Sequence, residues 1–478
     1  LVVLSKDKTS QRWYSYTYWG SPVENENIEG ALGPAPADRR FTFIAANFVD
    51  NDTEIGNTNT FTAGTPDGLD DNSNDWVNTP TGPMVPGVGY AATAGEFAPS
   101  FPITETFNFF GKFNNGEILV PLVSNSGGAY EDWNLVGNPY PCAINAIDFL
   151  TLNSSLIGVI YLWDQSTPPS STTGGGQNSN FSADDYAMIN GSGGIAATSN
   201  PLNTPNSFIP SGQGFFVDAS SAGNLTFNNS LRAITNNNGQ FFKKTKTKSK
   251  ASNSSANKLW VNLTSDNGVF NQILVSYING ATNANDGDFY DAPRSLSSVN
   301  NTSLYSVIEN DNSKFAIQAK ATSSLNEDEI INLGFKTTIT VPTLYKLSVA
   351  QLEGAFLTSN TLFLVDTLLN KVHDLSASDY TFTSAVGEFN SRFSIAFTNK
   401  ALSVNDVLLN TNALKIVDLQ DDFVQFNTSS NLTIKSVHIY DLLGRQLYQF
   451  KGENTSETYR LAHLNNSVYI AKVTLSNG

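Results

Sequence analysis

The sequence contains one cysteine, Cys142, and three histidines in 478 residues. A single cysteine cannot close a disulfide within the chain, and it cannot supply a cysteine-rich zinc site. The histidines, His373, His438 and His463, are far apart and lack the His-x-x-x-His spacing of a zinc hydrolase. The disulfide-stapled and zinc-dependent classes are therefore excluded, and packing alone has to hold the domains together.

Other catalytic signatures are also missing from the sequence. There is no Gly-x-Ser-x-Gly nucleophile motif, no phosphate-binding loop and no dinucleotide-binding glycine pattern before a helix. Cys142 follows Pro-Tyr-Pro in an apolar neighbourhood, which indicates a small core residue rather than a nucleophile. We therefore expect a protein without catalytic activity of its own. A glycosidase stays open as an alternative, because it needs only two carboxylates about 5–10 Å apart.

Charge is scarce and mostly of one sign. Charged residues make up 15% of the chain, and 43 acidic residues stand against 27 basic ones, for a net charge of −16. This charge disfavours nucleic acid and anionic membranes as partners, because both repel an acidic surface. No run approaches the ~18 apolar residues of a membrane-spanning helix, so we expect no transmembrane segment. A hydrophobic content of 40%, with 31 phenylalanines, is too high for a disordered chain.

The sequence predicts an all-β fold. Asn, Ser, Thr and Gly are abundant, and the first three compete with a helix for backbone hydrogen bonds. Alternating runs at residues 259–263 and 272–277 are typical of half-buried antiparallel strands. Helical patterns are short, with candidates only at residues 143–152 and 349–354. We therefore expect tandem antiparallel β-sandwich domains.

Composition also predicts the domain boundaries. Five of the eight residues 243–250 are lysine, and a Ser/Asn-rich stretch follows them. Such a segment is typical of a solvated linker, so we assign residues 243–257 to a linker. It would join a β-rich N-terminal domain, residues 1–242, to a β-sandwich domain, residues 258–399. A second break in the pattern predicts a C-terminal domain at residues 400–478.

An acidic loop in the first domain has the character of a metal site. Residues 67–75 contain four carboxylates as well as amides, and Ca²⁺ takes six to eight oxygen ligands from such flexible loops. The loop lacks the closing glutamate of an EF-hand, so an acidic solvated turn is the alternative. The candidate ligands for calcium are Asp67, Asp70, Asp71, Asn72 and Asp75.

Aromatic residues cluster near the start of the chain, at Trp13, Tyr14, Tyr16, Tyr18 and Trp19. Exposed rings at this density could form a platform on which sugars stack. The three tyrosines alternate with Ser and Thr, however, as the residues of an ordinary strand do. We therefore favour packing within a sheet over a sugar platform.

The end of the chain predicts a β-hairpin. Val437 and Ile439 face one side of a strand, Gly444 supplies a positive φ for a tight turn, and residues 446–450 return as the partner strand. Residues 468–473 alternate in the same way and would add another strand to a small sandwich of the immunoglobulin kind.

Motifs along the whole chain carry a resemblance to one class of proteins. They lie at residues 133–141, 161–163, 211–217, 288–293, 304–306, 333–336, 389–393, 437–447 and 464–473. With these motifs the chain resembles the C-terminal portions of surface and secreted proteins of Bacteroidota that the type IX secretion system exports. The last two motifs are similar to a type A sorting domain, which is an immunoglobulin-like C-terminal domain.

The resemblance implies a function in export and recognition. The sorting domain would be read by the outer-membrane translocon and a shuttle protein, and the protein would reach the extracellular space or the outer cell surface after periplasmic transit. The residues expected to be recognised are Tyr440, Asp441, Leu443, Gly444, Arg445, Tyr469 and Lys472. The upstream domains would form an adhesin-like stalk or binding head, with surface glycans or another adhesin as partners. The alternatives are the accessory part of a secreted glycosidase or protease, and a carbohydrate-binding module.

Overall fold

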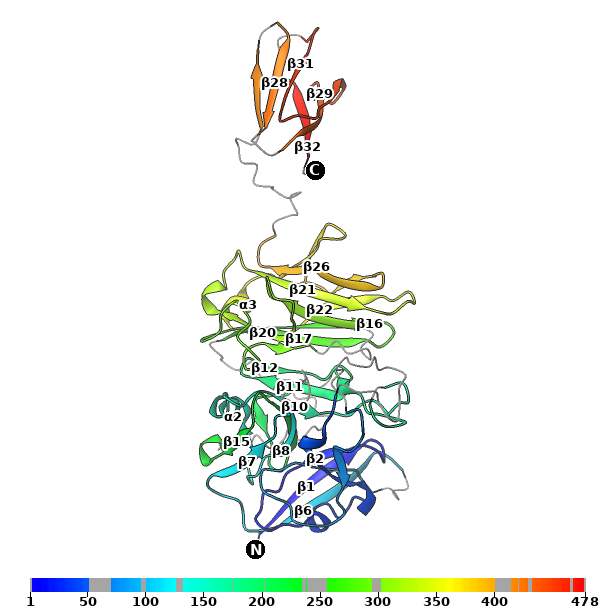
Figure 1. Cartoon of the computed structure of the whole chain (residues 1–478), viewed down its shortest axis with the longest axis vertical. Coiled ribbons are helices and arrows are strands. Elements are labelled where there is room, and N and C mark those ends of the chain that lie inside the picture. The colour runs from blue at the N-terminus through cyan, green and yellow to red at the C-terminus, as the bar shows by residue number, and fades with distance from the viewer. Residues whose placement is uncertain are drawn as a thin grey trace. The chain divides into compact units, whose positions relative to one another are not determined.

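The structure is a computed structural model. It describes residues 2–50, 70–95, 100–125, 132–173, 175–201, 203–233, 238, 256–294, 302–399, 414–419, 421–428, 432–464 and 467–476. Within these residues the expected all-β fold is confirmed, since nearly all strand pairs are antiparallel and the helices are short. The chain divides into two compact units, residues 1–399 and 400–478, which we call the first and second units (Figure 1). No helix of the described ranges is long and apolar enough to span a membrane.

The N-terminal part of the first unit is built from two larger sheets and three strand pairs (Figure 1). The four-stranded sheet, in the order β2-β5-β3-β4, consists of β2 (Thr17–Trp19), β3 (Arg40–Phe43), β4 (Trp76–Asn78) and β5 (Tyr90–Ala92). The five-stranded sheet, in the order β12-β11-β10-β14-β8, consists of β8 (Trp133–Gly137), β10 (Ile157–Trp163), β11 (Tyr186–Asn190), β12 (Gly193–Ile195) and β14 (Gly214–Ala219). The strand pairs are β1 (Val2–Ser10) with β6 (Ile103–Gly111), β7 (Ile118–Leu122) with β15 (Gly223–Phe227), and β9 (Ile144–Asn145) with β13 (Phe208–Ile209).

Two short helices accompany these sheets. Helix α1 spans Ile28–Ala31, and helix α2 spans Ala146–Leu152, within the predicted segment 143–152. Asn145 caps α2, because its side-chain oxygen accepts hydrogen bonds from the first backbone N–H groups of the helix. The helix packs its buried face, including Phe149, on the core beneath the five-stranded sheet.

An eleven-stranded sheet forms the C-terminal part of the first unit. Its strands are β16 (Asn257–Ser265), β17 (Phe270–Ile278), β18 (Ala292–Pro293), β19 (Thr302–Val307), β20 (Lys314–Ala321), β21 (Ile330–Thr337), β22 (Tyr345–Glu353), β23 (Phe363–Asp366), β24 (Lys371–Asp374), β25 (Tyr380–Phe382) and β26 (Gly387–Ala396). The sheet curls over its own core, because the Phe335 ring of β21 lies 5.3 Å from the Phe382 ring of β25, at the far end of the strand order. Strands β17 and β20 are parallel, unlike their neighbours.

The helix predicted at residues 349–354 is wrong, because these residues belong to strand β22 and to the turn that follows it. Strand β22 pairs with β16 from Tyr345 to Glu353, and this pairing satisfies the backbone groups that a helix would satisfy internally. Helix α3 (Ala355–Ser359) begins only after Gly354, whose φ of 88° is open to glycine.

The prediction of a half-buried strand at residues 272–277 is wrong, because strand β17 is covered on both faces. Every residue from Phe270 to Tyr277 is buried, so both faces of the strand are covered. One face packs on the core of the curled sheet, and Leu274 on the other face packs with Trp260 against Val159 and Ile195 of the N-terminal part. Trp260 Nε1–H also donates a hydrogen bond to a backbone oxygen of β12 at 2.8 Å. The two parts of the first unit thus share one apolar interface. The predicted linker, residues 243–257, lies outside the described residues up to residue 255.

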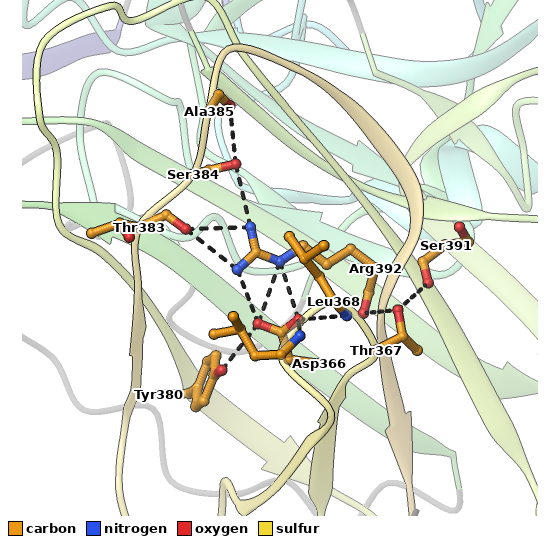
Figure 2. A network of polar contacts seen from close by, with 10 residues as sticks. Asp366, Thr367, Leu368, Tyr380, Thr383, Ser384, Ala385, Ser391 and Arg392 are labelled. Carbon is orange, nitrogen blue, oxygen red and sulfur yellow. Dashed lines mark hydrogen bonds and ion pairs between the residues drawn. The ribbon is translucent and has the colours of Figure 1, made fainter. Parts of the chain in front are cut away.

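A buried ion pair anchors the far edge of the curled sheet. The side chains of Arg392 on β26 and Asp366 on β23 are 2% and 0% exposed, and Arg392 Nη2 lies 3.0 Å from Asp366 Oδ2 (Figure 2). The Tyr380 hydroxyl donates a hydrogen bond to the same carboxylate, and the guanidinium also donates to the backbone oxygen of Thr383 (Figure 2). These hydrogen bonds compensate the cost of removing the two charges from water. The pair therefore contributes to the stability of the fold.

The second unit is a sandwich of two three-stranded sheets. One sheet holds β27 (Leu414–Asp418), β28 (Phe423–Thr428) and β31 (Ser456–Arg460), and the other holds β29 (Ile434–Tyr440), β30 (Gln446–Lys451) and β32 (Ile470–Leu475). The predicted hairpin is confirmed, because β29 pairs with β30 across a turn in which Gly444 has a φ of 80°. Strand β32 adds the third strand to this sheet, starting at Ile470 rather than at Val468.

Candidate functional site: an aromatic cavity between two sheets

A cavity of about 620 Å³ lies between the four-stranded and five-stranded sheets of the first unit. The five-stranded sheet provides one wall, and the register of its strands explains the composition of that wall. Tyr161 on β10 lies opposite Phe216 on one side and Met188 on the other, and Met188 lies opposite Ile195. Residues at paired positions point to the same face, so one continuous row of large side chains crosses the sheet.

The four-stranded sheet faces this wall with its own aromatic side chains. Tyr18 and Phe41 flank Ala91 in the register, and Phe43 lies opposite Trp76. The small side chain of Ala91 between two rings leaves space in the middle of this face.

Ring contacts join the two aromatic faces at one side of the cavity. The Tyr18 ring stacks on the Trp163 ring with 5.8 Å between centroids, and the Phe43 ring meets the Phe216 ring edge-on at 4.8 Å. The Tyr18 hydroxyl forms a hydrogen bond with the Tyr186 hydroxyl at 2.8 Å. Because each ring is fixed by another ring, the cavity keeps its shape without a ligand.

The remaining walls come from two segments distant in the sequence. Residues 175–184 cover one side, and Asp288, Pro293 and Arg294 close another side from beyond the predicted linker. A Cβ atom at Gly158 would lie 2.5 Å from the Cβ atom of Asp288, so only glycine lets this segment approach β10 so closely. Both parts of the first unit therefore contribute to one site.

The predicted aromatic cluster divides between the core and the cavity. Tyr16 and Tyr18 line the cavity, whereas Trp19 is fully buried in a separate core. Trp13 stays 41% exposed with the Arg39 guanidinium over its ring. Part of the cluster is therefore placed where a ligand can contact it, although its residues do lie in and beside an ordinary strand.

The acidic loop reaches the cavity through Asp70 and Asp75. The Asp70 carboxylate accepts backbone hydrogen bonds from Val49 at 3.1 Å and from Ser73 at 2.5 Å. Burial, together with the nearby Asp70 charge, raises the pKa of Asp75 to about 7. These two carboxyl groups share a hydrogen bond, so a proton held between them lowers the cost of burying both.

The other predicted metal ligands are placed differently. Asp71 is buried, Asn72 is half-buried and accepts a hydrogen bond from the backbone N–H of Asn74, and Asp67 lies outside the described residues. Within the described ranges, no group of three or more acidic, histidine or cysteine side chains is arranged to hold a metal ion.

The raised pKa of Asp75 predicts that the Asp75→Asn variant gains stability over the natural chain as the pH rises. The amide oxygen can still accept the hydrogen bond that the Trp76 N–H donates at 2.8 Å. The unfolded carboxyl ionises near 3.8 and the folded one near 7, so the natural chain loses stability as the pH rises through this window. We expect the variant to equal the natural chain below the unfolded pKa and to be more stable by roughly 1–3 kcal/mol above pH 7. Urea unfolding of both chains at several pH values measures the difference. A constant difference across the window would contradict this reading.

A second pair of carboxyl groups, Asp218 and Asp288, lines another side of the cavity. Burial, together with the nearby charges of Asp288 and Asp132, raises the pKa of Asp218 to about 7. Burial of its carboxyl group also raises the pKa of Asp288, although part of that residue stays exposed. Asp218 lies directly opposite Trp133 in the pairing of β14 with β8, so the acid and the indole share one face of the sheet.

Arg294 is the basic residue among the described residues that line the cavity. It is 9% exposed, and burial lowers its pKa to about 10 while the Asp184 charge opposes this shift. Its guanidinium donates a hydrogen bond to the backbone oxygen of Gln272. Sequence reasoning missed Asp218 and Arg294 as site residues, and it gave Asp288 only as the first residue of the motif at residues 288–293. Asp218 directly follows the motif at residues 211–217.

The remaining candidates for chemistry lie apart from the cavity. Cys142 is half-buried against the core, and burial raises the pKa of its thiol, so it stays protonated at neutral pH. His373 contacts Ser378, His438 stacks on Tyr440, and His463 is exposed.

The hairpin turn of the second unit gathers several predicted recognition residues. Asp441 Oδ1 accepts hydrogen bonds from the backbone N–H of Leu443 at 3.0 Å and of Arg445 at 2.9 Å. Asp441 Oδ2 lies 3.1 Å from Arg445 Nε, and the hydrogen bond from the Arg445 backbone lowers the pKa of Asp441. The turn holds Leu443 away from the protein, with 95% of its surface exposed.

The other predicted recognition residues surround this turn less closely. Tyr440 ends β29 with its hydroxyl donating to Gln446, and Lys472 on β32 is exposed opposite His438. Tyr469 is half-buried and packs against the core of the sandwich.

Comparisons with known proteins give two family matches. Residues 2–397 match the model described as Domain of unknown function (DUF8693), and residues 402–478 match the model described as Domain of unknown function (DUF8694). No curated protein and no solved structure matches the chain.

Proposed function

The chain belongs to the DUF8693 family, and since that description assigns no activity, we propose a function from the cavity itself. The first unit is a binding head for a glycan, and the protein is a non-catalytic component of the outer cell surface or the extracellular space. The observation that carries the proposal is the cavity of about 620 Å³, in which rings from two facing sheets surround carboxyl groups. Ligand sites in proteins have this size and this mixture of many aromatic and few polar groups.

The mixture of groups fits a sugar better than a purely apolar ligand. A pyranose ring has C–H faces that pack on aromatic rings and hydroxyl groups that need hydrogen-bond partners at its edge. Tyr161 and Trp133, which are only partly buried, offer such faces, and Asp218 and Asp288 offer acceptors for hydroxyl groups. An apolar ligand would leave the carboxyl groups without water and without partners, at a cost of about 1–3 kcal/mol for each group.

A glycan panel tests the binding head. We expect the full chain to bind at least one oligosaccharide, and the Trp133→Ala variant to lose that binding because it removes a ring from the cavity wall. The matched control is Trp13→Ala, which removes an equal ring outside the cavity and should leave binding unchanged. Equal binding by all three proteins, or no binding by any of them, would refute the proposal.

A glycoside hydrolase is the second candidate function. Asp218 with its raised pKa is a suitable general acid, and Asp288 beside it is a suitable second carboxylate. Incubation of the full chain with the glycan that it binds, followed by an assay for new reducing ends, separates the two candidates. Turnover that is lost in Asp218→Asn would replace the binding head with an enzyme.

For the second unit we propose an export signal of the type IX secretion system, read by the translocon and a shuttle protein. The turn around Gly444 supports this proposal, because Asp441 fixes its backbone and the side chains of Leu443 and Arg445 remain accessible. A rigid, exposed turn offers a partner a preformed surface, which lowers the entropic cost of binding.

Two substitutions in this turn should separate folding from recognition. Gly444→Val places a β-branched residue at a φ of 80° and should strain the turn by about 1–3 kcal/mol. Arg445→Ala removes an exposed side chain, so the melting temperature should hardly change while export falls. The measurement is the appearance outside the cell of a periplasm-targeted fluorescent protein fused to residues 401–478, in a host that has the secretion system. A folded fusion that stays in the periplasm would exclude the export role.

Calcium at the acidic loop is a further proposal for Asp70, Asp71, Asn72 and Asp75, with Asp67. A calcium ion would have to displace the proton that Asp70 and Asp75 hold between them, so its binding should strengthen as the pH rises. A site that is saturated at 100 times its Kd stabilises the folded state by about 2.7 kcal/mol. Addition of EDTA should then lower the melting temperature of the first unit, and an unchanged transition would mean that the loop binds no calcium.

A further inference from the structure

We infer that the part of the cavity between Trp133, Asp218 and Asp288 takes a positively charged amino group of the sugar ligand. The inference rests on the proposed binding head and deepens it, because it specifies an amino sugar with a free amine as the preferred unit.

The first step is the placement of the two acids beside aromatic rings. Asp218 lies opposite Trp133 in the register, and the Trp133 ring lies 4.8 Å from the Tyr161 ring in an edge-on contact. A cation between these groups would meet both ring faces and carboxylates. Ring faces attract cations through their quadrupole, and this attraction grows where water is excluded.

The second step is that the two acids lack partners of their own. Among the described residues, no group donates a hydrogen bond to the carboxyl group of Asp218 or Asp288, and no basic side chain forms an ion pair with either. The two groups instead disfavour each other's ionisation, because the charge of Asp288 raises the pKa of Asp218. A cation relieves this repulsion, whereas a hydroxyl group donates one hydrogen bond and leaves the charges uncompensated.

The third step is a comparison with the other acids at the cavity. Asp70 and Asp75 bond to each other and accept backbone N–H groups. Asp184 acts on Arg294, whose pKa it raises against the effect of burial. Asp218 and Asp288 are therefore the acids of the cavity lining whose carboxyl groups a ligand can still pair with.

The charge of the whole lining favours the same ligand. The described residues that line the cavity include five aspartates, Asp70, Asp75, Asp184, Asp218 and Asp288, and one arginine, Arg294. The net charge of the chain is −16, so the surrounding surface also attracts cations. A neutral or acidic sugar would gain nothing from this field.

The test compares two oligosaccharides that differ in charge but not in linkage. The probes are a β-1,4-linked glucosamine tetramer with free amines and its fully N-acetylated counterpart, titrated calorimetrically into the full chain at pH 7. We expect the free-amine tetramer to bind about tenfold tighter or more than the N-acetylated one. Asp218→Asn and Asp288→Asn should each remove most of this preference. The matched control Asp148→Asn removes a charge from the exposed side of α2 and should preserve the preference.

The outcomes separate this inference from the proposal beneath it. Equal affinity for both tetramers, or a preference that survives Asp218→Asn and Asp288→Asn, would overturn the amino-group inference and leave the glycan-binding head standing. Failure of the natural chain to bind either tetramer or any member of the glycan panel would overturn both. Folding does not confuse the result, because loss of a buried carboxyl charge at position 218 should not destabilise the chain.

Discussion

Replacement of Arg392 by alanine is expected to lower the free energy of unfolding of the first unit by about 3–5 kcal/mol. The substitution leaves the Asp366 carboxylate, which is 0% exposed, without the guanidinium that lies 3.0 Å away. The Tyr380 hydroxyl, which donates to Asp366 at 3.0 Å, cannot neutralise the charge. The three rings that lie under the guanidinium would also lose a partner (Phe382, Phe389 and Phe393).

Two controls make this result specific to the buried charge. The double variant Asp366→Leu/Arg392→Met removes both charges and should be much closer to the natural chain than Arg392→Ala, since paired apolar replacements of buried ion pairs are often neutral. Lys346→Ala breaks a salt bridge to Asp379 whose side chains are 44% and 49% exposed, and it should cost less than about 1 kcal/mol. Urea unfolding measures all three variants. A loss below 1 kcal/mol for Arg392→Ala would show that the pair contributes no more than a surface pair.

Replacement of Leu274 by alanine should cost about 2–5 kcal/mol, the range for truncation of a fully buried leucine. Leu274 is 0% exposed and lies in the interface between the two parts of the first unit, with Trp260 and Ile317 beside it. Because both parts share this interface, the substitution should destabilise both parts, and both should unfold at the same, lower urea concentration.

Hydrogen exchange of the backbone amides in β10 and β21 distinguishes the two parts, since the strands lie on opposite sides of the interface. The control is Leu443→Ala at a side chain that is 95% exposed, and it should leave both rates unchanged. If the Leu274→Ala variant destabilised β21 while β10 kept its natural protection, the two parts would fold independently.

Local features of the fold could be predicted from the sequence because their causes are local. The turn at Gly444 follows from one glycine between two alternating runs, and helix α2 follows from a capping asparagine before an apolar segment. The sequence at the end of strand β22 predicts a helix, because residues 349–354 are equally compatible with both states. Pairing with β16, which is distant in the sequence, decided between them.

The cavity could not be predicted because its residues come together only through tertiary contacts. Tyr18, Phe41 and Trp76 come from three strands of one sheet, Tyr161 and Phe216 come from the other, and the segment around Asp288 arrives from beyond the predicted linker. Each ring has the pattern of an ordinary strand residue, and no spacing in the sequence reveals that two apolar faces touch at one side and leave a cavity at the other. The same limit explains why the sequence predicts β17 to be half-buried. The outer face of β17 carries Leu274, but the elements that cover this face come from the N-terminal part of the first unit.

A crystal structure of the full chain with the tightest-binding glycan of the panel tests the central claim most directly. The account predicts a sugar ring between the two aromatic faces, packed against Trp133 or Tyr161, with a polar group within hydrogen-bond distance of Asp218 or Asp288. Binding of the glycan at another surface, with the space between the sheets occupied only by water, would contradict the account.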